Sequence, residues 1–150
     1  MIKQRLLMNV LFSSLLALGA CSGDKDPASP GGKKSAKFNI TIGDVKLAEG
    51  DRITVQVVGG VSGSAEKTLW KLNGTVMNNE SGILLDEDDF AAGGTFVVES
   101  VVGLDVVALH INSINSGTPL TVNVTGKVGG KDIAAVNQTV TSDYFKQFNY

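Results

Sequence analysis

The densest run of charge in the chain is acidic and comprises Asp86, Glu87, Asp88 and Asp89. Carboxylate oxygens are hard ligands of the kind that Ca²⁺ takes in protein loops. The spacing does not fit an EF-hand loop, because Ala91 stands where that loop needs glycine and Val97 where it needs a bidentate glutamate. Acidic residues also favour the first turn of a helix, with Asp86 as the N-cap. We therefore expect a short helical turn that ends at Gly93-Gly94, with calcium binding by Asp86, Asp88 and Asp89 as the alternative.

His110 is the only histidine in the chain, and Cys21 is the only cysteine. A zinc site normally needs a second histidine or several cysteines, and a Ser-His-Asp triad would have to use His110. The chain lacks the Gly-x-Ser-x-Gly turn that supports such a nucleophile, and it has no glycine-rich phosphate loop. We expect His110 to be a solvent-facing or hydrogen-bonded strand residue. No catalytic residue, metal ligand or cofactor is predicted, and the chain is expected not to be an enzyme.

Aromatic side chains gather in the segment Tyr144–Tyr150, which holds four of the nine aromatic residues of the chain. We expect this segment to be a closing strand of a β domain. The alternative is an edge strand that pairs with a partner chain, because free sheet edges are templates for pairing. Trp70 is expected in the core. An exposed aromatic strip beside a groove would favour a glycan ligand, whereas a long unpaired apolar edge would favour a protein partner.

The N-terminus has the pattern of an export signal. Met1–Arg5 carries two bases and no acid, and Leu6–Gly19 is a predominantly apolar stretch. As a helix, this stretch would reach about 21 Å, which is short of a bilayer core of about 30 Å. We therefore interpret it as the hydrophobic region of a signal peptide and not as a transmembrane helix.

The residues that follow, Leu18-Gly19-Ala20-Cys21, resemble the lipobox of bacterial lipoproteins. The resemblance covers only residues 1 to about 22. It implies cleavage between Ala20 and Cys21 by the lipoprotein signal peptidase, and attachment of a diacylglyceryl group to the Cys21 thiol. The alternatives are an ordinary signal peptide with an incidental cysteine and a buried core cysteine. Two or three acyl chains would hold the protein on the membrane essentially permanently.

The same resemblance also bears on localisation. Ser22 stands where an aspartate commonly retains such lipoproteins in the inner membrane, so the outer membrane is implied. Asp24 and Asp26 resemble the acidic stretch that takes some lipoproteins to the cell surface, which leaves periplasmic or surface exposure open. Removal of residues 1–20 takes Lys3 and Arg5 from the 13 bases, and the remaining 11 bases against 15 acids give −4. The net charge of −2 of the whole chain argues against nucleic acid as a partner.

Residues 21–37 are expected to form a lipidated, disordered tether, because 22–37 holds two of the three prolines and no large apolar side chain. From Phe38 the pattern changes to a period of two. Strands with one buried and one solvated face are predicted at Phe38–Ile42, Ile53–Val57 and Leu120–Val124, and more fully buried strands at Thr95–Val102 and Val106–Ile111.

Turn residues separate these runs. Asn73-Gly74 predicts a type I′ hairpin that places Trp70 opposite Met77, and Gly129-Gly130 predicts a hairpin into Asp132–Thr141. Eight to ten short strands in residues 38–150 predict an all-β, antiparallel two-sheet β-sandwich, immunoglobulin-like or transthyretin-like, with a small barrel as the alternative. The expected function is a lipid-anchored bacterial envelope protein that displays this sandwich as an adhesion or assembly module. Its expected partners are the membrane, through Cys21, and an envelope protein. A module that binds a carbohydrate or another ligand is the alternative.

Overall fold

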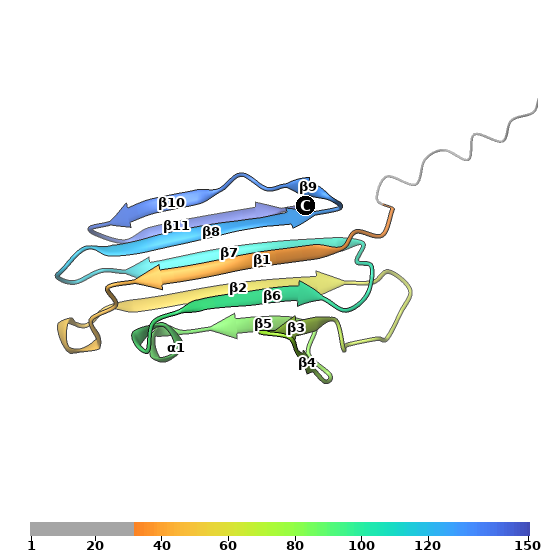
Figure 1. Ribbon diagram of the computed structural model, residues 1–150, viewed down its shortest axis with the longest axis horizontal. Helices are drawn as coiled ribbons and strands as arrows, with labels where there is room; N and C mark the ends of the chain where they lie inside the picture. The colour runs from red at the N-terminus through yellow and green to blue at the C-terminus, as the bar shows by residue number, and fades with distance from the viewer. Residues whose placement is uncertain (1–31) are drawn as a thin grey trace, which may run out of the picture. The chain divides into compact units, whose positions relative to one another are not determined.

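The computed structural model describes residues 32–150, so Ala20, Cys21 and the rest of residues 1–31 lie outside the described part. That part is a β domain of eleven strands, one short α-helix and one 3₁₀ turn (Figure 1). The elements in chain order are β1 (Ala36–Gly43), η1 (Leu47–Glu49), β2 (Arg52–Gly60), β3 (Trp70–Leu72), β4 (Thr75–Met77), β5 (Gly82–Leu85), α1 (Glu87–Ala91), β6 (Thr95–Ser100), β7 (Val106–Ile114), β8 (Leu120–Val128), β9 (Lys131–Asp132), β10 (Val136–Val140) and β11 (Tyr144–Asn149).

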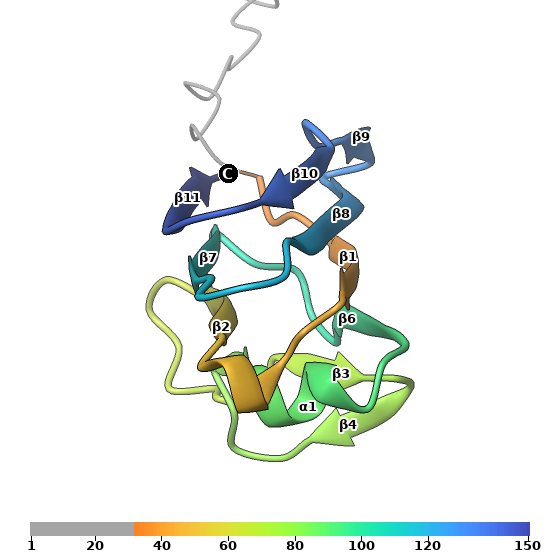
Figure 2. The same ribbon diagram turned by 90° about the vertical axis from the view of Figure 1, so that its left-hand side faces the viewer.

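The strands form two antiparallel sheets that face each other (Figure 2). The larger sheet has the order β10-β8-β1-β6-β3-β4, with β9 also paired to β8, and the smaller has the order β11-β7-β2-β5. Edge strands β10 and β11, one from each sheet, lie on the same side of the sandwich in both views. This arrangement confirms the predicted all-β, antiparallel two-sheet sandwich. Among residues 32–150, no helix has the length and apolar character needed to span a bilayer.

The core lies between the sheets and is built from the alternating apolar residues of the long strands. Phe38, Ile40 and Ile42 of β1 are fully buried, as are Leu109 and Ile111 of β7. The alternation of apolar and polar residues therefore correctly predicts which face of each strand is buried. β1 begins at Ala36, two residues before the predicted start of the domain, because its paired main chain already runs alongside β8 from Ala36.

The two predicted hairpins are confirmed. Asn73 and Gly74 have φ values of 50° and 85°, and Trp70 lies opposite Met77. Both central residues of a type I′ turn need positive φ, which asparagine and glycine tolerate. Gly129 and Gly130 join β8 to β9 in the same way, with φ values of 59° and 78°.

One strand expected over Asp132–Thr141 is instead two, β9 and β10, because of a β-bulge. Asp132 lies opposite Lys127, whereas Val136 lies opposite Val124, so the register shifts by one residue between them. A shift of one residue turns every later side chain to the other face. The bulge at residues 133–135 thereby points Val136 and Val140 into the core, where both are buried.

Candidate functional site

The acidic run forms the predicted helical turn. The Asp86 carboxylate accepts hydrogen bonds from the main-chain N–H groups of Asp88 (3.1 Å) and Asp89 (3.4 Å), and the Asp89 carboxylate accepts one from the Asp86 N–H (3.0 Å). This reciprocal pair is a capping box at the start of α1. Phe90 anchors the turn in the core and makes an edge-to-face contact with Phe96. The acids of α1 thus serve to start a helix, and within residues 32–150 no group of three or more His, Cys, Asp or Glu side chains could hold a metal ion.

His110 and Trp70 also lie where they were expected. His110 is on the outer face of β7, between Gln147 of β11 and Gln56 of β2. Trp70 is completely buried, and its indole N–H donates to the main-chain oxygen of Ser81 at 3.0 Å.

β11 is the predicted closing strand, and it is also an edge strand, because it pairs only with β7 among the described elements. Its aromatic side chains are divided between two faces. Tyr144 and Phe148 lie opposite the buried residues Ser113 and Leu109 and point inward, whereas Phe145 points outward and is 65% exposed. These side chains therefore do not form the single exposed strip that would favour a sugar ligand.

The free edge of β11 presents the main-chain groups of alternate residues. The N–H of Tyr150 donates to the Val107 oxygen at 2.9 Å, and the register continues this pattern along the strand. In an antiparallel ladder the hydrogen-bonded pairs alternate. Even-numbered residues of β11 consequently bond to β7, and Phe145, Gln147 and Asn149 direct their N–H and C=O groups to the free edge.

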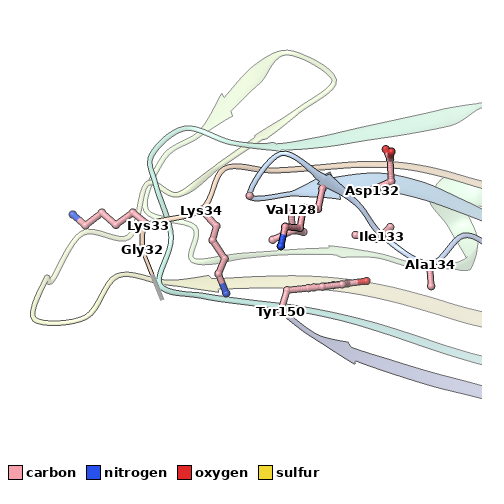
Figure 3. Close-up of a pocket in the computed structure, with 10 residues that line it drawn as sticks. Gly32, Lys33, Lys34, Val128, Asp132, Ile133, Ala134 and Tyr150 are labelled. Carbon is pink, nitrogen blue, oxygen red and sulfur yellow. The ribbon is translucent and has the colours of Figure 1, made fainter. Parts of the chain in front are cut away.

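A pocket of about 570 Å³ lies at the end of the sandwich where β1 begins and β11 ends. Its lining combines Lys34, the β8–β9 turn, the bulge residues Ile133 and Ala134, and Tyr150 (Figure 3). Figure 3 shows the Lys34 side chain extending toward Tyr150, whereas Lys33 points away from this opening. We call this cavity the end pocket.

The Tyr150 side chain closes one wall of the end pocket. Its ring is parallel to that of Phe148, with 6.2 Å between centroids, and it lies equally far from Phe38 of the other sheet. The hydroxyl oxygen of Tyr150 is buried and has no hydrogen-bond partner. Burial also raises the pKa of this hydroxyl above its usual value.

A second polar cluster, which we call the Asp51 corner, lies where β2 starts beside the β7–β8 turn. Asp51 is fully buried, and its carboxylate accepts from the N–H groups of Lys46 (2.8 Å) and Ser116 (3.1 Å). The Asn115 amide nitrogen donates to Asp51 at 3.4 Å and to the Thr118 oxygen at 2.6 Å, but the Asn115 amide oxygen is buried without a partner. A buried polar atom left unpaired costs free energy, so it marks a position open to a further partner.

Neither the end pocket nor the Asp51 corner is predicted by the sequence analysis. The residues of each come from distant parts of the chain, 46–51 with 115–118 in one case and 32–34 with 128–150 in the other. A single polar residue within a turn, such as Asp51 after Gly50, gives no signal of burial. The burial of Asp51 becomes evident only from the tertiary structure.

Comparison with solved structures identifies similar folds. A DUF4425 family protein from Bacteroides ovatus matches with a TM-score of 0.52 and 11% identity over 79% of this chain and 95% of that chain. A protein from Parabacteroides distasonis, solved by NMR in a calcium-bound form, matches with a TM-score of 0.51 and 20% identity over 85% of this chain and 100% of that chain. These likenesses show a shared fold. No protein-family description and no curated protein matches the sequence.

Proposed function

We propose that this chain is a lipid-anchored envelope protein of the outer membrane, and that its β-sandwich binds a partner protein through the free edge of β11. The lipobox-like segment ending at Cys21 supports the anchor. The observation that carries the binding role is the edge of β11 that pairs with no other strand among residues 32–150, where the N–H and C=O groups of three alternate residues face outward beside the exposed Phe145. An extended segment of a partner can extend the sheet there by β-augmentation.

The charge of β11 indicates the kind of segment that fits. Lys146 is the only charged residue of the strand, and it has no salt bridge in the described part of the chain. Its ammonium group lies 5.7 Å from the centroid of the Phe148 ring. Lysine on an edge strand opposes indiscriminate pairing. A partner strand with an acidic residue opposite Lys146 would compensate this charge, and so we propose an extended, acidic partner segment.

The anchor is tested by Cys21→Ser. The variant is expected to keep its signal peptide and to incorporate no labelled palmitate, because the acceptor thiol is gone. Mass spectrometry of the N-terminus gives the readout, and normal maturation of the variant would overturn the anchor. Protease treatment of intact and lysed cells then separates surface exposure from periplasmic exposure.

The docking edge is tested with a photo-crosslinking amino acid at position 145 in intact cells. The same probe at Leu84 is the control, since Leu84 is 61% exposed on β5 at the opposite edge of the same sheet. A crosslinked partner is expected from position 145 only. Gln147→Pro should abolish this product, because it removes an edge-facing N–H that β7 does not use. A product that persists in Gln147→Pro, with unchanged folding, would contradict docking on this edge.

Calcium binding at the Asp51 corner is a second candidate function. Oxygen atoms of Asp51, Asn115, Glu49 and Thr118 gather there, and oxygen is the ligand that Ca²⁺ takes. Turning the Asn115 amide would bring its oxygen toward Asp51 and the Thr118 carbonyl, an arrangement that a cation would stabilise. The calcium-bound form of the Parabacteroides distasonis protein, which shares the fold, supports this candidate.

A thermal unfolding experiment distinguishes calcium binding from a purely structural corner. Addition of about 1 mM Ca²⁺ to the chelator-treated protein should raise its Tm by a few degrees, because a ligand that binds only the folded state stabilises that state. Glu49→Gln should reduce the rise, whereas Glu80→Gln, at an exposed glutamate outside the corner, should preserve it. Equal Tm values with and without Ca²⁺ would exclude this candidate.

A further inference from the structure

We infer that the end of the sandwich where β1 begins is a contact surface for anionic phospholipid headgroups, which orient the domain on its membrane. This inference rests on the lipid anchor proposed above and adds the orientation of the anchored domain. Two observations carry it. The two ends of the strands differ in charge, and the chain enters the domain at the basic one.

Lysine side chains gather around two hollows at this end. Antiparallel pairing places Ala36, at the start of β1, opposite Val128, at the end of β8. The end pocket and a smaller hollow of about 210 Å³ adjoin this point, and their linings include five lysines and two acids. The five lysines, which we call the basic corner, are Lys33, Lys34, Lys37, Lys127 and Lys131.

The basic corner has a surplus of positive charge. The two acids of the lining, Glu99 and Asp132, each pair with one lysine, at 3.8 Å and 2.9 Å between nitrogen and oxygen. Lys33, Lys34 and Lys131 have no salt bridge among residues 32–150. Lys33 and Lys131 are exposed, and Lys33 points away from the end pocket (Figure 3). A surface with many negative charges can therefore meet several ammonium groups here at once.

The other charges of this end lie in the loops beside β2 and β3. They comprise Glu66, Lys67, Glu80 and Asp105. The carboxylates of Glu66 and Asp105 accept main-chain N–H hydrogen bonds within these loops, both 2.6 Å long. The positive surplus is thus local to the side formed by β1, β8 and β9, and we expect this side of the end to meet the headgroups.

The opposite end of the strands is acidic. The β1–β2 connection, α1 with its N-cap, and the β10–β11 turn meet there (Figure 1). These segments carry two bases, Lys46 and Arg52, against eight acids. The acids are Asp44, Glu49, Asp51, Asp86, Glu87, Asp88, Asp89 and Asp143. Because an anionic surface attracts the basic corner and repels this end, the separation of charge favours one orientation of the domain.

The chain reaches the domain at the basic corner. The described part begins at Gly32, next to Lys33, and Cys21 precedes Lys33 by twelve residues. Twelve residues span at most about 43 Å, so a lipid on Cys21 would keep the basic corner near the headgroups. Each lysine that reaches an anionic surface strengthens the contact about fivefold. The net charge of the whole chain is −2, so these lysines orient a domain that its lipid attaches.

Orientation is tested on nanodiscs that carry the mature chain, residues 21–150, and a lipid with a nitroxide headgroup. Cys21 is the only cysteine, so its coupling to a maleimide lipid supplies the anchor chemically. NMR relaxation enhancement compares the amide of Gly130, in the β8–β9 turn, with that of Asp88 in α1. The ratio of the Gly130 to the Asp88 enhancement should be at least about threefold higher with about 30% phosphatidylglycerol than with phosphatidylcholine alone.

Salt provides a test without any substitution. About 0.5 M NaCl should abolish the difference between the two lipids, because it screens charges over a few ångströms. Equal ratios in the two lipids would overturn the inference, and so would a difference that salt leaves unchanged.

A charge-matched pair of variants assigns the effect to the basic corner. Lys131→Glu and Lys46→Glu make the same change of charge at exposed side chains, the first in the basic corner and the second at the acidic end. Lys131→Glu should lower the ratio in phosphatidylglycerol at least about twofold, whereas Lys46→Glu should preserve or raise it. Both variants should keep the wild-type Tm. Equal ratios in the two variants would contradict the inference.

This experiment is separate from the test of the anchor. The maleimide lipid holds the chain on the nanodisc whether or not cells acylate Cys21. Normal maturation of Cys21→Ser in cells would therefore contradict the proposed anchor, whereas equal ratios on nanodiscs would contradict the orienting surface alone.

Discussion

Gly59 and Gly60 are neighbours in β2, yet only Gly59 has to be glycine. A Cβ atom on Gly59 would lie 2.8 Å from the Trp70 ring and 2.9 Å from a Leu104 methyl group, whereas one on Gly60 would meet nothing closer than 3.9 Å. The lack of a side chain at Gly59 is therefore what lets the buried tryptophan pack against this strand. The sequence Gly-Gly alone does not distinguish the two positions.

This difference predicts unequal effects of alanine at the two positions. Gly59→Ala should lower the free energy of unfolding by about 1–3 kcal/mol, because a methyl group would overpack the contact with Trp70 and Leu104. Gly60→Ala should change it by less than about 0.5 kcal/mol. Urea denaturation followed by Trp70 fluorescence measures both, and equal effects would contradict the packing argument.

The two tyrosines near the C-terminus predict a loss of stability at alkaline pH. Burial raises the pKa of Tyr144 and Tyr150 above the model-peptide value of 10.0. The folded state thus holds these protons more tightly than the unfolded state, so their contribution is complete below pH 10 and is lost as pH rises through the folded-state pKa. The Tyr144→Phe, Tyr150→Phe double variant should show a smaller decline in stability above pH 10 than the wild type. Identical declines would show that neither tyrosine contributes.

At the scale of elements, the bulge between β9 and β10 shows how one residue determines which side chains are buried. Period-two alternation within Asp132–Thr141 is ambiguous, because the polar and apolar residues change phase at residues 133–135. This change of phase is the feature of the sequence that corresponds to the bulge. Its position becomes evident only when the partner residues on β8 are known.

Insertion of one alanine after Ala134 is expected to destabilise the protein. With the bulge unchanged, the added residue would move Val136 and Val140 by one position along β8 and turn both to solvent. The burial of two valines is worth about 3 kcal/mol, and a loss of this size should be seen in urea denaturation. Deletion of Ala134 is the control, because regular pairing from Asp132 then brings Val136 opposite Val124 again and keeps both valines buried. Similar stabilities for the insertion and the deletion would contradict the role of the register.

At the scale of the whole described domain, β11 joins the two sheets through its inward side chains. Phe148 and Tyr150 project from the smaller sheet, and the Tyr150 ring meets Phe38 of the larger sheet at 6.2 Å. β11 therefore closes one side of the sandwich with its inner face, while no other strand of residues 32–150 pairs with its outer main-chain edge. The two alternatives for this segment, a closing strand and a pairing edge, are thus compatible in one strand.

This division of roles predicts that the two phenylalanines of β11 differ in their effects. Phe148→Ala should lower the free energy of unfolding by about 1–3 kcal/mol, because it removes a half-buried ring from the closure between the sheets. Phe145→Ala should be nearly neutral for stability, since this ring is 65% exposed. Thermal unfolding of both variants provides the test, and a larger loss for Phe145→Ala would contradict the assigned orientation of the strand.

The sequence by itself determined the local features of this protein. Alternation identified the dry faces of β1, β2 and β8, Asn73-Gly74 specified its turn through positive φ, and Asp86 specified the helix start through its short acceptor side chain. Each of these depends on forces between residues close in the chain. The Asp51 corner, the end pocket and the free edge of β11 were decided by tertiary structure, because burial, an unpaired atom and a missing neighbour strand arise only when distant segments meet.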